Sequence, residues 1–141
     1  MEINHQKIEK EAQRLGIKMV ILFGSQAEKK ARSDSDYDIA VLTAEKNNIS
    51  DLKNYNTALF FLSEALAIPD HKLDLTNLNH AGPFLGAEIA RIGQLLYGNE
   101  DNFATFKASA MREYIATQDL RELEDKLIIK RQRILAEKIY A

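Results

Sequence analysis

The stretch LFGSQAEKKARSDSDYDIAVL, residues 22–42, joins two predicted β-strands through a glycine–serine pair and an aspartate-rich turn. The run KMVILF, residues 18–23, is apolar on both faces, which is typical of a central strand covered from both sides. A second strand is predicted over residues 36–42, after the turn cluster SDSD. Between them QAEKKA, residues 26–31, has the composition of a short helical segment. The stretch therefore predicts two strands of one sheet and a polar connection between them.

The chain around this stretch alternates helical and extended patterns. Residues 5–15 repeat apolar side chains at helical spacing, and Gly16 is their stop signal. Ser50 is the predicted N-cap of the next helix, which has leucine and tyrosine at helical spacing up to residue 66. Residues 71–78 alternate as a strand, with Asp74 on the polar side between two inward leucines. The order predicts one α/β domain.

The last third of the chain is predicted to be helical. A helix with Pro83 in its first turn and a short edge strand over residues 94–98 come first. From residue 99 the chain has no proline or glycine, and one unbroken helix would be about 60 Å long at ~1.5 Å per residue. Asp119 and Glu122 resemble a capping box, so we expect a break near residues 117–119. We therefore divide the chain into a core, residues 1–98, and a helical tail for partner docking, residues 99–141.

Composition limits the class of protein. Of the 141 residues, 45% are apolar and 28% charged, the balance of a globular protein, and no apolar run is long enough for a membrane span. The absence of cysteine excludes disulfides and thiolate metal sites and favours a cytoplasmic location. A net charge of −2 predicts neither direct nucleic-acid binding nor attraction to anionic membranes.

The second strand starts with two aspartates whose side chains share one face. Asp36 and Asp38 are two positions apart, so on a strand they project to the same side. Two close carboxylates repel each other unless a cation lies between them, and Mg²⁺ prefers a few carboxylate oxygens together with waters and substrate phosphates. Two solvated aspartates at the start of an exposed strand are the alternative, which the pair favours when taken alone.

The glycine–serine pair changes this interpretation. Gly24 has no Cβ, so the backbone could approach a bulky ligand closely, and Ser25 could donate its hydroxyl to an anion. The alternative is an ordinary turn between a strand and a helix. A third carboxylate, Asp74, could complete a site for two metal ions or act as general base, or could be an edge aspartate without a role.

In this order the motifs resemble those of the DNA polymerase β-like nucleotidyltransferase superfamily. Gly24 and Ser25, ten residues and then Asp36 and Asp38 match its first motif, and KLDLTNL is similar to its third-carboxylate strand. More narrowly, the chain resembles the minimal nucleotidyltransferases, or MNT antitoxins, which are encoded beside HEPN-domain toxins. The resemblance implies an α/β (α+β) fold with a small mixed sheet flanked by helices.

The resemblance also implies roles for individual residues. Gly24 and Ser25 would contact the nucleotide phosphates, Asp36 and Asp38 would ligate Mg²⁺, and Asp74 would be the third ligand or the base. The family often has arginine and glycine where this chain has Glu28 and Lys29. An inward-pointing Glu28 would weaken triphosphate binding, so we expect nearby cations, among them Lys29 and Arg32, to compensate.

The function implied by the resemblance is transfer of AMP from ATP to a tyrosine of a HEPN ribonuclease toxin. The core supplies a phosphate site and a metal site but little that could hold an acceptor, so we expect the acceptor on another molecule. One alternative is adenylylation of a small molecule, as in aminoglycoside-modifying relatives. Another is an antitoxin that acts by binding alone. A homo-oligomer or a mixed complex is compatible with the amphipathic tail.

Overall fold

A mixed four-stranded sheet lies at the centre of the fold. In the computed structural model, which describes residues 2–29 and 35–140, the strand order is β3-β2-β1-β4. The strand β1 pairs antiparallel with β2 and with β4, whereas β2 and β3 are parallel. The strands are β1 (Ile17–Phe23), β2 (Tyr37–Thr43), β3 (Leu73–Asn77) and β4 (Gln94–Tyr97). The predicted mixed sheet and the edge position of its last strand are confirmed.

The strand β1 is buried on both faces, as its sequence predicts. Its side chains alternate between two hydrophobic clusters, with Val20 and Leu22 in one and Met19, Ile21 and Phe23 in the other. An apolar run without alternation suits a strand that has a core on each side. The central strand therefore joins the two halves of the core.

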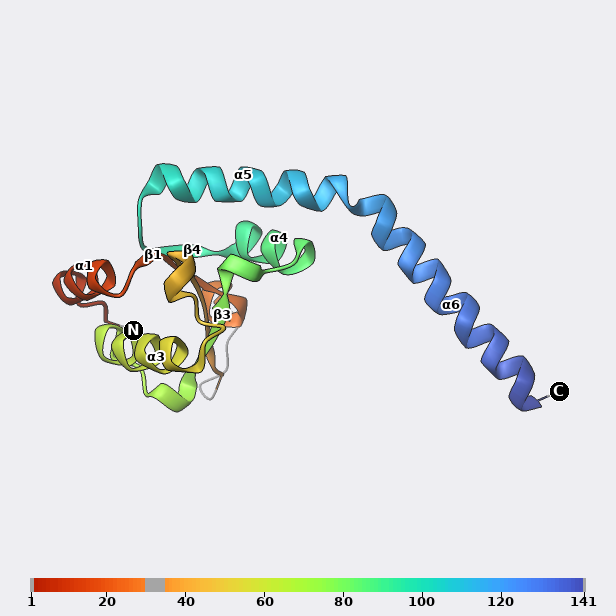
Figure 1. The fold of residues 1–141 in the computed structure, drawn as a ribbon, viewed down its shortest axis with the longest axis horizontal. Coiled ribbons are helices and arrows are strands. Elements are labelled where there is room, and N and C mark those ends of the chain that lie inside the picture. The colour runs from red at the N-terminus through yellow and green to blue at the C-terminus, as the bar shows by residue number, and fades with distance from the viewer. Residues whose placement is uncertain (1, 30–34, 141) are drawn as a thin grey trace.

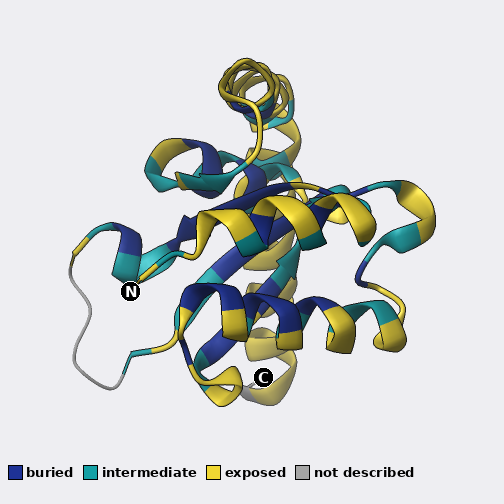
Figure 2. Cartoon of the chain, turned by 90° about the vertical axis from the view of Figure 1, so that its left-hand side faces the viewer, coloured by how far each residue is buried: buried dark blue, intermediate teal, exposed yellow. Residues whose placement is uncertain are grey.

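The helices α1 (His5–Arg14) and α3 (Leu52–Leu66) cover one face of the sheet. Ile8 of α1 and Leu62 of α3 are fully buried in the cluster that contains Val20. Figure 2 shows the buried segments in the strands and on the helix sides that face them. Helix α1 ends one residue before the predicted limit, at Arg14.

The helices α4 (Pro83–Ile92) and α5 (Glu100–Ala116) cover the other face (Figure 1). Ile89 of α4 is fully buried against the sheet, and Phe103 brings α5 into the same cluster. Pro83 occupies the first turn of α4, as predicted. The molecule thus has α1 and α3 in one layer, the sheet in the middle, and α4 with α5 on the far side.

Two short elements differ from their predicted limits. The helix α2 (Gly24–Ala27) begins directly after β1 and ends before Glu28, whereas a helical segment was expected over residues 26–31. Short 3₁₀ turns on both sides of β3 shorten the expected strand of residues 71–78. The turn at Leu78–His80 begins because the Asn77 side chain accepts a hydrogen bond from the Asn79 backbone NH at 3.0 Å.

The predicted N-cap of α3 is wrong by one residue. The Asp51 side chain accepts hydrogen bonds from the backbone NH groups of Lys53 and Asn54, at 2.8 and 3.4 Å. The Ser50 hydroxyl instead accepts a hydrogen bond from the Asn77 side-chain amide at 2.8 Å. Serine and aspartate are both good caps, so their order alone could not decide between them.

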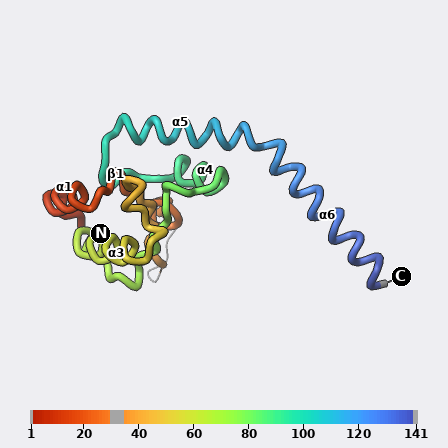
Figure 3. The backbone as a smooth tube through the Cα atoms, viewed as in Figure 1, coloured from red at the N-terminus to blue at the C-terminus, as the bar shows by residue number. Residues whose placement is uncertain are grey.

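The last helix, α6 (Gln118–Tyr140), follows α5 after a break at Thr117 and projects away from the other layers, as Figures 1 and 3 show. The break lies where the sequence predicts it, but the cause is different. Asp119 lies inside the first turn of α6 and is not its N-cap. The Arg121 guanidinium donates to the Tyr114 carbonyl at 2.8 Å and lies 3.8 Å from the centre of its ring. This arginine fixes the corner between the two helices.

Among the residues described, no helix is both long enough and apolar enough to cross a lipid bilayer.

Candidate active site

The end of β1 and the beginnings of β2 and β3 meet at one edge of the sheet. Phe23, the last residue of β1, is paired with Asp38 of β2, and Asp38 lies beside Asp74 of β3 in the parallel register. Neighbouring strands are about 4.8 Å apart, so the Asp38 and Asp74 side chains are direct neighbours. Gly24 is the next residue after Phe23 and lies at the same edge.

The aspartate side chains point to the face of the sheet on which α4 packs. Ala40, two positions after Asp38, belongs to the cluster beneath α4, and the alternation of β2 therefore places Asp38 on that face. Leu73 and Leu75 are buried on the opposite face, so Asp74 between them points the same way as Asp38. Asp36 directly precedes β2 and is exposed, whereas Asp38 is half-buried. The predicted common face for the carboxylates follows from this register.

Gly24 touches the Asp38 carboxylate and needs to be glycine for two reasons. Its φ of +74° lies in the left-handed region that side chains disfavour. A Cβ on Gly24 would also lie 2.2 Å from Oδ2 and 3.0 Å from Cγ of Asp38. The close approach predicted for this glycine is thus made to a carboxylate of the chain itself.

The pKa of Asp38 is raised above the ordinary aspartate value. Partial burial is the largest cause, and the negative charges of Asp74 and then Asp36 add to it. The three carboxylates therefore influence one another through space. A cation at this edge would relieve both the desolvation and the repulsion.

In residues 2–29 and 35–140, no three acidic, histidine or cysteine side chains are grouped closely enough to hold a metal ion together. Mg²⁺ needs fewer protein ligands, because it is commonly held by one or two carboxylates and completes its shell with water and substrate phosphate. The neighbouring carboxylates of Asp38 and Asp74, with Asp36 on the same side, fit such an open site. The expected placement of two ions stays a prediction.

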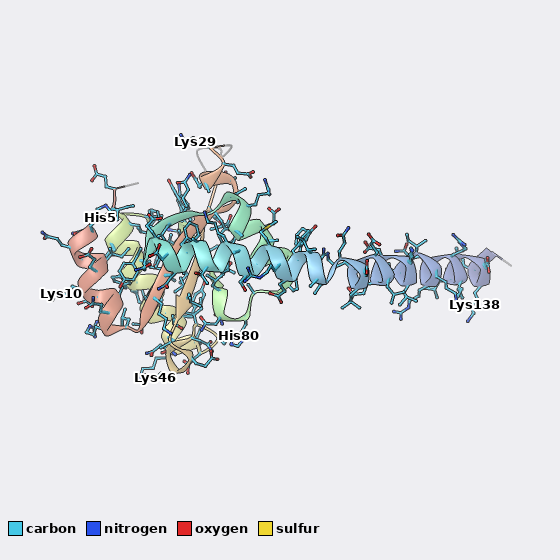
Figure 4. The ribbon with its side chains drawn as sticks, turned by 90° about the horizontal axis from the view of Figure 1, so that it is seen from above. His5, Lys10, Lys29, Lys46, His80 and Lys138 are labelled. Carbon is cyan, nitrogen blue, oxygen red and sulfur yellow. The ribbon has the colours of Figure 1, made fainter. Side chains whose placement is uncertain are left out.

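The predicted phosphate-binding residues are distributed unevenly around this edge. Ser25 lies in the first turn of α2 and is half-buried, next to Gly24. Lys29 is exposed and has a left-handed backbone, with φ of +58°. Seen from above in Figure 4, Lys29 lies at the opposite end of the sheet from His80 and Lys46. Arg32 lies outside the described residues.

Glu28 faces a cation that sequence reasoning missed. A carboxylate oxygen of Glu28 lies 3.9 Å from the Arg91 guanidinium, which also accompanies Glu88 at 3.2 Å. Arg91 belongs to the last turn of α4, 63 residues further along the chain. No motif links the two positions, and only the packing of α4 beside α2 could have revealed this pair.

Two glutamines hold the turn around α2 in place. The Gln26 side chain donates to the Ser35 carbonyl at 3.2 Å, and the Gln94 side chain donates to the Ala27 carbonyl at 3.0 Å. They connect α2 to the start of β2 and to β4. These positioning residues give no signal in the sequence, because glutamine is common on surfaces.

Comparison with known sequences places these features in a family context. A profile of the family described as "Polymerase beta, Nucleotidyltransferase" matches residues 6–102. The protein adenylyltransferase MntA of Aphanizomenon flos-aquae is 31% identical over 113 residues, which cover 77% of this chain and 73% of that protein.

Solved structures share the same architecture. A chain in the crystal structure of a toxin–antitoxin with AMP-PNP has a TM-score of 0.69 at 25% identity, covering 90% of this chain and 99% of the other. A chain in the complex of a tri-AMPylated Shewanella oneidensis HEPN toxin with an MNT antitoxin has a TM-score of 0.63 at 24% identity, covering 89% and 96%. The predicted polymerase β-like α/β fold is confirmed.

Proposed function

The chain belongs to the polymerase β nucleotidyltransferase family, and on that premise we propose that it is a Mg²⁺-dependent antitoxin that AMPylates its toxin. The substrate is ATP, and the acceptor is a tyrosine of a HEPN ribonuclease. The observation that carries this proposal is the contact between Gly24 and Asp38, with Asp74 as the lateral neighbour of Asp38. The sequence relative named protein adenylyltransferase and the complex with an AMPylated toxin support the acceptor class.

Each residue at the sheet edge has a role in this proposal. Asp36, Asp38 and Asp74 would hold magnesium, which when bound would withdraw electrons from the reacting phosphate and offset the charge of the leaving pyrophosphate. Ser25 and the backbone NH groups of the tight turn at Gly24 would bind the triphosphate. Lys29 would add a positive charge at the outer end of this turn.

The transfer itself forms one bond and breaks one. The tyrosine oxygen of the acceptor attacks the α-phosphorus of ATP, the bond to the β-phosphate oxygen breaks, and pyrophosphate leaves. The proton of the tyrosine hydroxyl goes to the carboxylate of Asp74, which lies beside the half-buried Asp38 at the exposed edge of the sheet. Arg91 draws the carboxylate of Glu28 toward α4. The negative charge of Glu28 is therefore partly balanced before a triphosphate binds.

A labelling experiment tests the proposal. The wild-type chain, incubated with ATP labelled at the α-phosphate, magnesium and its HEPN partner, should transfer label to the partner. The double substitution Asp36→Ala/Asp38→Ala should abolish the transfer, and mass spectrometry should place the AMP on tyrosine. Equal labelling by both forms would refute the roles of the two aspartates.

A second measurement separates catalysis from binding. The ribonuclease activity of the partner should fall only after ATP and magnesium are added to the wild-type chain. If the double variant inhibits the ribonuclease as well as the wild type does, the antitoxin acts by binding alone.

A further inference from the structure

The helix α6 exposes a continuous apolar face that no other described element covers. All its described side chains beyond Arg121 are exposed, and several large apolar ones are more than 50% exposed. Six of these residues define what we call the α6 face, which spans about 140° of the helix circumference at ~100° per residue: Leu120, Leu123, Leu127, Ile128, Ile134 and Leu135. Figure 4 shows α6 extending alone beyond the rest of the molecule.

Charged residues run along the middle of the α6 face at regular spacing. Glu124, Arg131 and Lys138 are each seven residues apart, so they form a nearly straight line between the two apolar edges. A hollow of about 260 Å³ lies between Glu124, Leu127, Ile128 and Arg131. An apolar face with a charged centre line is suited to a partner with the complementary order of charges.

A second copy of α6 has that complementary order when it runs antiparallel. If residue i lies opposite residue 255 − i, Glu124 of each copy faces Arg131 of the other. The two-fold axis then passes between Leu127 and Ile128, and the hollow between them accepts the same side chains from the second copy. Leu120 lies opposite Leu135, so apolar residues also meet on both sides of the ion pairs.

Other arrangements of the two helices bring like charges together. A parallel pair would place Glu124 on Glu124, Arg131 on Arg131 and Lys138 on Lys138. An antiparallel pair shifted by one heptad would match Glu124 with Lys138 but place the two copies of Arg131 opposite each other. Like charges in contact oppose association, so the charge order selects one register.

We propose that the chain forms a two-fold symmetric homodimer through the α6 face, with the helices antiparallel and Glu124 paired with Arg131 of the second copy. A self-complementary patch of this kind is what a two-fold interface requires. The inference does not rest on the catalytic role, because no residue of the α6 face belongs to the candidate active site.

Charge exchange on the full-length chain tests the register. Sedimentation equilibrium of the wild type should give twice the chain mass. Arg131→Glu should raise the dimer dissociation constant about tenfold or more, because Glu124 then faces a glutamate. The double variant Glu124→Arg/Arg131→Glu should restore the constant to within about threefold of wild type. The matched control Arg133→Glu changes the same residue type on the opposite side of α6 and should have no such effect.

Cross-linking tests the orientation, since the chain has no cysteine of its own. Ile128→Cys should be joined by a short thiol-reactive cross-linker, because the two copies lie close to the axis. Ile139→Cys should not react in this way, because antiparallel copies of residue 139 are about 35 Å apart at ~1.5 Å per residue.

Several results would overturn the proposal. A monomeric wild type would do so, as would cross-linking of both cysteine variants, which indicates parallel helices. Failure of the double charge exchange to restore association would exclude the register. If Arg131→Glu abolishes binding of the HEPN partner while the mass of the free chain stays unchanged, the α6 face is a docking site for the toxin instead. Far-ultraviolet circular dichroism of each variant should remain that of the wild type, because all substituted residues are exposed.

Discussion

At the scale of the residue, Gly24 satisfies two requirements at one backbone position. It turns the chain through a positive φ at the end of β1 and leaves space for the Asp38 carboxylate. The motif predicts that a ligand approaches this glycine. The structure adds that Asp38 itself fills the space beside it, which no spacing in the sequence reveals.

Gly24→Ala should therefore abolish nucleotidyl transfer without unfolding the chain. The new Cβ would displace the Asp38 carboxylate, and a displacement of about 1 Å in such a site reduces rates on the order of 100-fold. The left-handed backbone adds about 1–2 kcal/mol of instability. Transfer rates and urea denaturation measure the two effects.

Gly86→Ala is the matched control, because a Cβ there would meet only Ala110, at 4.0 Å. It lies inside α4, where alanine stabilises a helix by up to about 1 kcal/mol relative to glycine. Equal activity of Gly24→Ala and Gly86→Ala would contradict the importance of the contact with Asp38.

The raised pKa of Asp38 makes stability depend on pH. In the window between the ordinary aspartate pKa and the raised one, the folded chain binds more protons than the unfolded chain. The free energy of unfolding therefore falls as pH rises through this window, and the loss is complete above the raised pKa. Asp38→Asn removes the loss, so without magnesium its Tm should exceed that of the wild type at neutral pH.

The difference in Tm between Asp38→Asn and wild type should shrink below about pH 4, where aspartate is protonated in the unfolded chain as well. Thermal denaturation at a series of pH values measures it. Magnesium should raise the Tm of the wild type and not that of the variant. Asp125→Asn, on exposed α6, is the control, and a pH-independent difference for Asp38→Asn would exclude this explanation.

At the scale of the element, the sequence predicts those features that depend on local patterns. The double-sided burial of β1, the inward leucines of β3 and the first-turn proline of α4 all follow from periodicity and proline chemistry. The N-cap of α3 was misplaced because Ser50 and Asp51 compete, and Asn77, distant in sequence, engages Ser50. The ion pair of Glu28 with Arg91 depends on how two helices pack, which periodicity does not determine.

Phe103 attaches α5 to the core, and its removal should destabilise the whole chain. It is buried in the same cluster as Ile89 and Ile21. Phe103→Ala should lower the free energy of unfolding by about 3 kcal/mol, because it leaves a cavity between α5 and the sheet. Urea denaturation measures this value.

Phe84→Ala provides the comparison for Phe103→Ala, since Phe84 is 65% exposed on α4. We expect it to change the free energy of unfolding by no more than about 0.5 kcal/mol. Similar losses for both variants would mean that α5 is not anchored by Phe103.

Arg121 should control the angle between α5 and α6. Arg121→Ala removes its hydrogen bonds to Thr117 and Tyr114 and its stacking on the tyrosine ring. Spin labels at Ser109→Cys and Arg133→Cys should then give a broader distance distribution, while Tm stays nearly constant. Arg112→Ala, an exposed arginine of α5, should leave the distribution unchanged, and a narrow distribution in Arg121→Ala would show that the corner has another support.

At the scale of the whole molecule, α6 adds no buried side chain to the described core. A chain shortened after Thr117 should therefore keep its cooperative unfolding, with a change in Tm of no more than about 2 °C. It should also lose self-association. Calorimetry and sedimentation of the shortened and full-length chains provide the measurement, and a large fall in Tm in dilute solution would show that α6 supports the core.

The corner at Thr117 matters because α6 acts as a lever. Its 23 residues reach about 35 Å at ~1.5 Å per residue, so a swing of about 10° at the corner moves the far tip by about 6 Å. A single arginine at the pivot thus sets the aim of the entire arm. Loosening that pivot would widen the volume that the tip searches and, in exchange, reduce the accuracy with which it meets its target.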